Sequence, residues 1–176
     1  MKRSELAHIL RSACVITGDP NILVLGSQSI LGSFGEEVLP PEATGSIEAD
    51  VAFMDDPEEV KSDKVDGNIG EVSLFHEEFG VYGQGVSVST AVLPEGWRER
   101  LVAFDHPEAG ESQAFCLDPH DLVISKLVAG REKDFAFARA LIEADLVQVG
   151  TLRARANLLS GVGAIKSRVE SWLDRL

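Results

Sequence analysis

The chain has 176 residues, of which 44% are hydrophobic, and its 29 acidic and 16 basic residues give a formal net charge of −13 at pH 7. This length and composition suit one soluble globular domain, and no apolar run approaches the roughly 20 residues that a membrane-spanning helix needs. The negative charge repels phosphate backbones, so nucleic acid is not expected as a partner of the isolated chain, whereas a basic protein or a small ligand held through a metal stays open.

Two features of the sequence bear on where the protein works. Cys14 and Cys116 lie far apart in apolar surroundings, which is typical of buried thiols in a reducing compartment and not of a disulfide framework or a zinc site. The first ten residues carry charges but lack an apolar stretch that ends in a small-residue cleavage site. We therefore expect a cytoplasmic protein without a secretory signal.

The first third of the chain predicts a helix, a strand and a turn. Apolar spacing after Ser4, the expected N-cap, indicates a helix that ends at Gly18. Residues 22–25 read as a short buried strand, which turns at Gly26-Ser27 into a second helix that stops near Gly35. We expect a loop at Pro40-Pro41.

The middle of the chain holds an acidic strand and less regular segments. The strand is expected over residues 49–54 and is followed by Asp56 as N-cap and Pro57 as the first residue of a short helix. Residues 67–85 are rich in glycine, which indicates turns and a functional loop. Three later β-type runs predict antiparallel additions to the sheet, over residues 86–92, 101–104 and 113–117.

The last third reads as helices. Asp118 is the expected N-cap of the first of them, Gly130 separates it from the next, and the final segment is amphipathic with Trp172 on its apolar side. The predicted fold is α/β (α+β): a mixed sheet with flanking helices over about residues 1–117 and a helical C-terminal part over about 118–176, in one domain.

An acid pair stands out in the stretch GSIEADVAF. Glu48 and Asp50 are two residues apart on an expected strand, so they point to the same face and repel each other unless a cation sits between them. Mg²⁺ prefers oxygen ligands and often bridges carboxylates to substrate phosphates, and the preceding Gly26-Ser27 turn could present N–H groups to the same phosphates. In the alternative interpretation the acids face solvent on an edge strand.

LVLGSQSIL followed by SIEADVAF resembles the signature of the nucleotidyltransferase superfamily, a Gly-Ser turn before an acid-x-acid strand. The chain also resembles a poorly characterised branch of small proteins in that superfamily, which are related to abortive-infection toxins of the AbiEii type. The resemblance spans about residues 22–145. It implies that Glu48 and Asp50 are catalytic and bind Mg²⁺, and that Gly26 and Ser27 contact the nucleotide.

The later segment LDPHDLVISKLVAGREKDFAFARAL is similar to the helices that lie near the triphosphate in that superfamily. The resemblance assigns Lys126 and Arg131 to offsetting the charge of the NTP. Both would converge only if the helix breaks at Gly130, because about 140° of helical rotation otherwise separates them. A solvated basic face that Lys126 shares with Lys133 is the structural alternative.

Two departures from the superfamily pattern bear on activity. The gap between Ser27 and Glu48 is wider than usual, and Ser87 and Ser89 stand where a third carboxylate is expected. The sequence does not choose among four substitutes for that acid, namely Asp66, Glu71, Glu77 and Asp105.

Two functions follow from these patterns. The first is a Mg²⁺-dependent enzyme that moves a nucleoside monophosphate from an NTP to the hydroxyl of an unknown acceptor. The second is a catalytically silent relative, a binding protein in a toxin and antitoxin pair whose acidic surface docks a basic partner. A third acid near Glu48 and Asp50 in space would favour the first.

Overall fold

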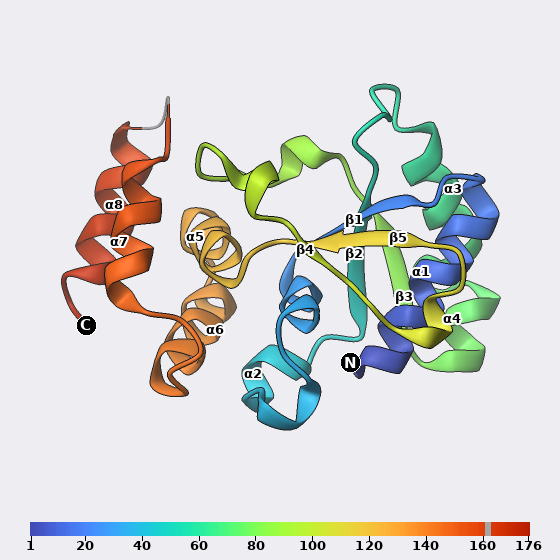
Figure 1. Ribbon diagram of the computed structural model, residues 1–176, viewed down its shortest axis with the longest axis horizontal. Coiled ribbons are helices and arrows are strands. Elements are labelled where there is room, and N and C mark those ends of the chain that lie inside the picture. The colour runs from blue at the N-terminus through green and yellow to red at the C-terminus, as the bar shows by residue number, and fades with distance from the viewer. Residues whose placement is uncertain (161–162) are drawn as a thin grey trace.

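The computed structural model describes residues 1–160 and 163–176 and is built around a five-stranded mixed sheet with the strand order β3-β2-β1-β5-β4 (Figure 1). The central strand β1 pairs antiparallel with β2 and parallel with β5, while β3 adds parallel to β2 and β4 adds antiparallel to β5. The expected mixed sheet with flanking helices is confirmed. The strands are β1 (Asn21–Leu25), β2 (Glu48–Ala52), β3 (Tyr82–Gly85), β4 (Val102–Ala103) and β5 (Gln113–Cys116).

One face of the sheet is covered by helices from the first half of the chain. A side chain at Gly83 of β3 would meet Ile9 of α1 and Ile69 of α3 at 3.0 and 3.1 Å, so the glycine lets both helices pack closely on this strand. The helices of this half are α1 (Arg3–Thr17), α2 (Pro41–Thr44), α3 (Val60–Ile69) and α4 (Leu74–Phe79). Short 3₁₀ helices connect these elements and the later strands: η1 (Ser27–Gly32), η2 (Glu36–Val38), η3 (Val88–Thr90), η4 (Trp97–Arg100) and η5 (Pro107–Ala109).

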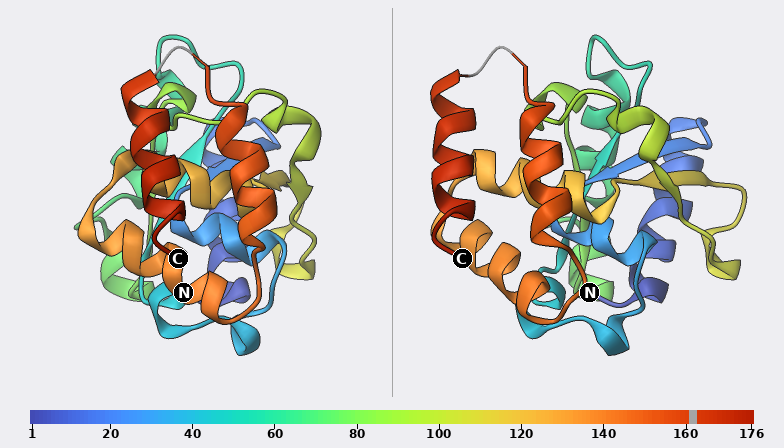
Figure 2. Two further views of the ribbon diagram at one scale, coloured as in Figure 1. Left: turned by 90° about the vertical axis from the view of Figure 1, so that its left-hand side faces the viewer. Right: turned by 60° about the vertical axis from the view of Figure 1, so that its left-hand side comes forward.

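The C-terminal helices gather at the other end of the molecule, away from α1, α3 and α4 (Figures 1 and 2). They are α5 (Pro119–Ala129), α6 (Glu132–Glu143), α7 (Val149–Asn157) and α8 (Gly163–Leu173). The Asp118 carboxylate accepts the N–H groups of His120 and Asp121, and Gly130 ends α5 with a φ of 70°, as the sequence predicts. No helix among the described residues is both long and apolar enough to cross a membrane.

Several predicted boundaries in the first third of the chain are wrong. Ser4 lies inside α1, whose N-cap is Lys2. The expected helix after Gly26 is the six-residue 3₁₀ helix η1, which ends at Gly32 and not near Gly35. Pro41 begins the short helix α2 instead of a loop, because its fixed φ suits the first helical position.

The helix after the acidic strand starts three residues later than expected. α3 begins at Val60, and Pro57 belongs to the turn before it. The N-cap is Glu59 and not Asp56, although the Asp56 carboxylate still accepts the N–H groups of Lys61 and Ser62 in the first turn, at 3.0 and 2.9 Å. The turn places Glu59 at a φ of 58°, and this left-handed residue shifts the start of the helix.

The glycine-rich middle is more regular than predicted. Residues 67–85 form the end of α3, then α4, then the edge strand β3, because the glycines stop and start these short elements. The expected strand over 86–92 is instead the 3₁₀ helix η3 with extended flanks. Of the two later runs, β4 is antiparallel as expected, whereas β5 pairs parallel with β1.

Candidate functional site

The two acids of β2 point to the face of the sheet opposite α1 and α3. Ala49 and Val51 are fully buried, and Ala49 pairs with Gly83, the residue that lies against those helices. Glu48 and Asp50 alternate with them and are half-buried on the other face. β2 lies between β1 and β3, so the edge-strand alternative for the acid pair is wrong.

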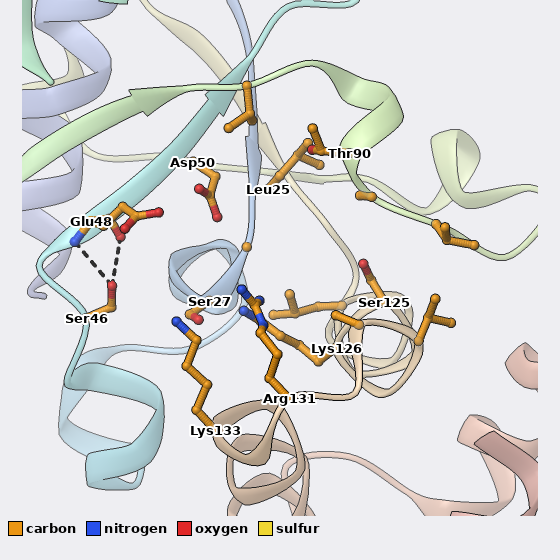
Figure 3. Close-up of a pocket in the computed structure, with 17 residues that line it drawn as sticks. Leu25, Ser27, Ser46, Glu48, Asp50, Thr90, Ser125, Lys126, Arg131 and Lys133 are labelled. Atoms are coloured by element: carbon orange, nitrogen blue, oxygen red, sulfur yellow. Dashed lines mark hydrogen bonds between the residues drawn. The ribbon is translucent and has the colours of Figure 1, made fainter. Parts of the chain in front are cut away.

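A cavity of about 390 Å³ opens on this second face, between β2, the end of β1 and the helices α5 and α6. Figure 3 shows Lys126, Arg131 and Lys133 pointing from the helical side toward Ser27, with Glu48 and Asp50 on the facing strand. All six residues singled out by the sequence line the cavity, namely Gly26, Ser27, Glu48, Asp50, Lys126 and Arg131. The fold therefore brings the predicted set together from three separate segments.

The acid pair is electrostatically unfavourable as it stands. Burial and the neighbouring Glu48 carboxylate raise the pKa of Asp50 to about 6, although Lys126 and Arg131 act in the opposite direction. Glu48 is held by a hydrogen bond from the Tyr82 hydroxyl to its Oε2, at 2.9 Å. The site thus combines a fixed carboxylate with one that resists ionisation.

Asp134 holds two cations at the opposite wall. This buried acid lies 3.5 Å from Lys126 Nζ and 2.7 Å from Arg131 Nε. In one continuous helix Lys126 and Arg131 would point in different directions. Because the helix breaks at Gly130, both side chains reach Asp134. Burial alone would raise the pKa of Asp134, but the Arg131 hydrogen bond and the Lys126 charge lower it, so the acid stays ionised.

Lys126 is far less exposed than its sequence context indicates. Only 8% of the residue is accessible, and burial lowers its pKa while Asp134 and Asp50 counteract that effect. The solvated basic face is therefore wrong for Lys126, although Lys133 is exposed and lines the same cavity. The prediction of a shared basic face depended only on the spacing of seven residues between Lys126 and Lys133.

The turn at Gly26 fits only glycine. Its φ of 62° and ψ of −165° lie in a region that residues with a Cβ scarcely populate. Asp50 packs directly on this backbone, and Ser27 then starts η1 at the floor of the cavity. Because η1 is a short 3₁₀ helix, it contributes local N–H groups and not a long helix dipole.

None of the four proposed substitutes for the third acid lines this cavity. The Asp66 carboxylate is hydrogen-bonded to β3 instead: its Oδ1 accepts the Gly85 N–H at 2.6 Å and the Gln84 side-chain amide at 3.0 Å. It therefore covers the exposed edge of β3. Glu48 and Asp50 are the acids among the described residues that line the site.

The donor set can be compared with what Mg²⁺ requires. Among the described residues, no three or more His, Cys, Asp or Glu side chains form a group able to hold a metal ion. Mg²⁺ commonly takes only one or two protein carboxylates and completes its shell with water and substrate phosphates. Glu48 and Asp50 fit that pattern, and a cation between them would relieve the repulsion that raises the pKa of Asp50.

Comparison with known proteins assigns the class. Residues 5–163 match the family described as a nucleotidyltransferase of unknown function (DUF6036), and the chain belongs to this family. The match supports the predicted superfamily and does not extend to the AbiEii-type branch. No curated protein and no solved structure matches the chain.

The structure also identifies polar residues that the sequence does not single out for this site. Ser46, Thr90 and Ser125 line the cavity and add hydroxyl groups to its wall. Tyr82 reaches Glu48 from the neighbouring strand, where the two residues are register partners. The only available signal was that Tyr82 is the single tyrosine of the chain, in a glycine-rich segment.

Proposed function

We propose that the chain binds the triphosphate of an NTP in this cavity and transfers a nucleoside monophosphate to the hydroxyl of an acceptor. One observation carries the proposal: two carboxylates on β2 face three cations on α5, on α6 and on the turn between them, across a cavity floored by Gly26 and Ser27. Phosphate groups are the ligands that such cations and close backbone N–H groups recognise. The family match supports the same class of reaction.

The cations have different parts in this proposal. Lys126 and Arg131 are held in place by Asp134, so their charges are positioned before the ligand arrives. Lys133 is exposed and free to follow the phosphates. Together they would offset the charge of the triphosphate and of the pyrophosphate that leaves.

Glu48 and Asp50 would hold Mg²⁺, which when bound would neutralise phosphate charge and favour attack by the acceptor hydroxyl. Glu48 meets this role with one carboxylate oxygen already hydrogen-bonded to Tyr82. Asp50 contributes a carboxylate whose position is set by contact with Gly26.

A catalytically silent binding protein is the second candidate. The observation that favours it is the lack of a third acid among the described residues that line the cavity. Residues 1–117 carry 21 acidic and 7 basic residues, a net charge of −14, whereas residues 118–176 carry 8 and 9, a net charge of +1. An acidic surface of this kind suits a basic protein partner, as in a toxin and antitoxin pair of the abortive-infection type.

Melting curves with each NTP, with and without Mg²⁺, test nucleotide binding. At about ten times its dissociation constant a ligand stabilises by roughly 1.4 kcal/mol, which raises the melting temperature by about 2 to 4 °C for a domain of this size. The wild type should show this rise only with both nucleotide and Mg²⁺. The variant Glu48→Gln/Asp50→Asn should lose it, whereas Glu77→Gln/Glu78→Gln, an equal charge change on exposed residues of α4, should keep it.

Labelled NTP then separates the two candidates. Transfer of label to protein, RNA or small-molecule acceptors would establish the enzyme. A metal-dependent shift without transfer to any of them would favour the silent binding protein. If no NTP produces a metal-dependent shift, nucleotide binding in this cavity fails, and the binding protein that docks a basic partner takes its place.

A further inference from the structure

Glu48 is fixed from a neighbouring strand by the only tyrosine of the chain. Glu48 and Tyr82 are register partners in the parallel pair β2–β3, so their side chains stand on the same face of the sheet. The Tyr82 hydroxyl donates a hydrogen bond to Glu48 Oε2 at 2.9 Å, and the tyrosine is only 7% exposed. This contact therefore persists as long as the tyrosine ring keeps its place.

The ring of Tyr82 is itself supported by α4. His76 packs against it with ring centroids 4.8 Å apart and an interplanar angle of 46°. His76 is anchored in turn, since its Nδ1 accepts the N–H of Val72 at 3.1 Å. The hydroxyl that reaches Glu48 therefore belongs to a side chain packed on two sides, by the sheet and by α4.

The hydrogen bond from Tyr82 leaves one oxygen of Glu48 for another partner. A hydrogen bond from a hydroxyl to a carboxylate is stronger than one between two neutral groups. The Tyr82 hydroxyl occupies Oε2 of Glu48 in this way, and Oε1 is left for a second ligand.

We propose that Tyr82 is a positioning residue for metal binding: it occupies Oε2 of Glu48 and presents Oε1 to the cation that Glu48 and Asp50 would share. The inference rests on the proposed function. A Mg²⁺ ion needs near-ideal octahedral geometry, which favours a carboxylate that binds through one oriented oxygen. Groups that orient metal ligands in this way typically change metal affinity by 10- to 100-fold when removed.

The variant Tyr82→Phe tests the proposal, because it removes the hydroxyl and keeps the ring that packs on His76. Mn²⁺ serves as a probe for Mg²⁺, and its binding is followed by electron paramagnetic resonance with a non-hydrolysable NTP present. We expect the Mn²⁺ dissociation constant to rise about tenfold in the variant. Ser62→Ala is the matched control, since it also removes a hydroxyl that donates to a carboxylate, that of Asp56 at 3.0 Å, outside the cavity; it should bind as the wild type does.

A second measurement needs no variant. Tyrosine labelled with ¹³C at Cζ gives one resonance, because the chain has one tyrosine. Adding Mg²⁺ and nucleotide to the wild type should shift this resonance, while nucleotide without metal should not. Wild-type affinity in Tyr82→Phe, or a resonance unmoved by metal in a wild type that binds Mn²⁺, would overturn the role of Tyr82 alone. A wild type that does not bind Mn²⁺ at all would overturn it together with the proposed function.

Discussion

The carboxylate of Asp50 occupies the space that a side chain at position 26 would need. A Cβ built on Gly26 would overlap Asp50 Oδ2 and lie 2.8 Å from its Cγ. Gly26 is therefore needed for two reasons. Its positive φ forms the turn after β1, and its lack of a side chain leaves room for the Asp50 carboxylate of β2.

Gly26→Ala should therefore lower the free energy of unfolding for two reasons, backbone strain and displacement of Asp50. Strain at the φ of 62° and ψ of −165° of Gly26, a region that is essentially restricted to glycine, costs about 1 to 3 kcal/mol. Gly18→Ala is the reference for a left-handed glycine without a clash, since Gly18 has a φ of 71° and a ψ of 14° with no atom within 4 Å of an added Cβ. Urea unfolding should show a larger loss for Gly26→Ala, and the excess should shrink when both proteins also carry Asp50→Ala. An equal loss at both glycines would mean that the overlap with Asp50 is relieved without consequence.

The pH dependence of stability should report on Asp50. Because its pKa is raised to about 6 in the folded protein, the folded state binds more protons than the unfolded state between about pH 4 and 6, and stability falls as pH rises through that window. Asp50→Asn lacks this term, so the variant should gain up to about 3 kcal/mol on the wild type across the window. Chemical unfolding at several pH values without metal measures the difference.

Asp118→Asn provides a control of opposite sign for the pH experiment. Burial alone would raise the pKa of Asp118, but hydrogen bonds from His120 and the Asp121 N–H lower it. Its stabilising contribution is present above the unfolded pKa of about 4 and is lost as pH falls further. A wild-type profile that is parallel to that of Asp50→Asn would contradict the assignment of the raised pKa to Asp50.

Lys133 offers the cleanest test of the cationic wall. Lys133→Ala should change the free energy of unfolding by less than about 0.5 kcal/mol, because the side chain is exposed, and should weaken NTP binding about tenfold through loss of a charge-assisted contact. Lys64→Ala, an exposed lysine on α3 outside the cavity, is the matched control and should leave calorimetric NTP affinity unchanged. Equal affinity in both variants would leave Lys133 as a surface charge.

Lys126 should behave differently from Lys133. It is buried beside Asp134, so Lys126→Met, which keeps most of the packing volume, still removes one of the two cations that compensate this acid. We expect NTP affinity to fall and the free energy of unfolding to fall by about 1 to 3 kcal/mol. Unchanged stability in urea would show that Arg131 alone compensates Asp134.

Asp121 links the C-terminal helices to the segment before β4. It is fully buried, and its carboxylate bonds Arg100 at 2.8 Å and pairs with Arg155 at 3.1 Å. Asp121→Ala leaves two guanidinium groups without their partner and should cost about 3 to 5 kcal/mol in urea unfolding. Arg153→Ala breaks an exposed pair with Asp174 and should cost less than about 1 kcal/mol. Similar losses of the free energy of unfolding in the two variants would contradict a special role of Asp121 in stability.

The elements that could be predicted from the amino-acid sequence are those with local signals. The strand that became β1, the Asp118 cap and the break at Gly130 each depend on a few adjacent residues, because caps and left-handed glycines act within one turn. The acid pair on β2 was also predictable, since strand periodicity alone puts Glu48 and Asp50 on one face. The elements in the middle of the chain could not be predicted, because short helices and an edge strand between glycines have too few residues for a hydrophobic periodicity to be recognised.

The surroundings of each face of a strand or helix became known only from the folded structure. Periodicity could not say whether the acids face solvent or a cavity, since that depends on α5 and α6, some 70 to 90 residues later in the chain. The same holds for Lys126, which is buried because Asp134 and Phe137 of the next helix lie against it. Asp66 is excluded from the site by its bonds to β3, and Tyr82 is joined to Glu48 by strand pairing. Burial and ion pairing depend on contacts between distant segments, and such contacts exist only once the chain is folded.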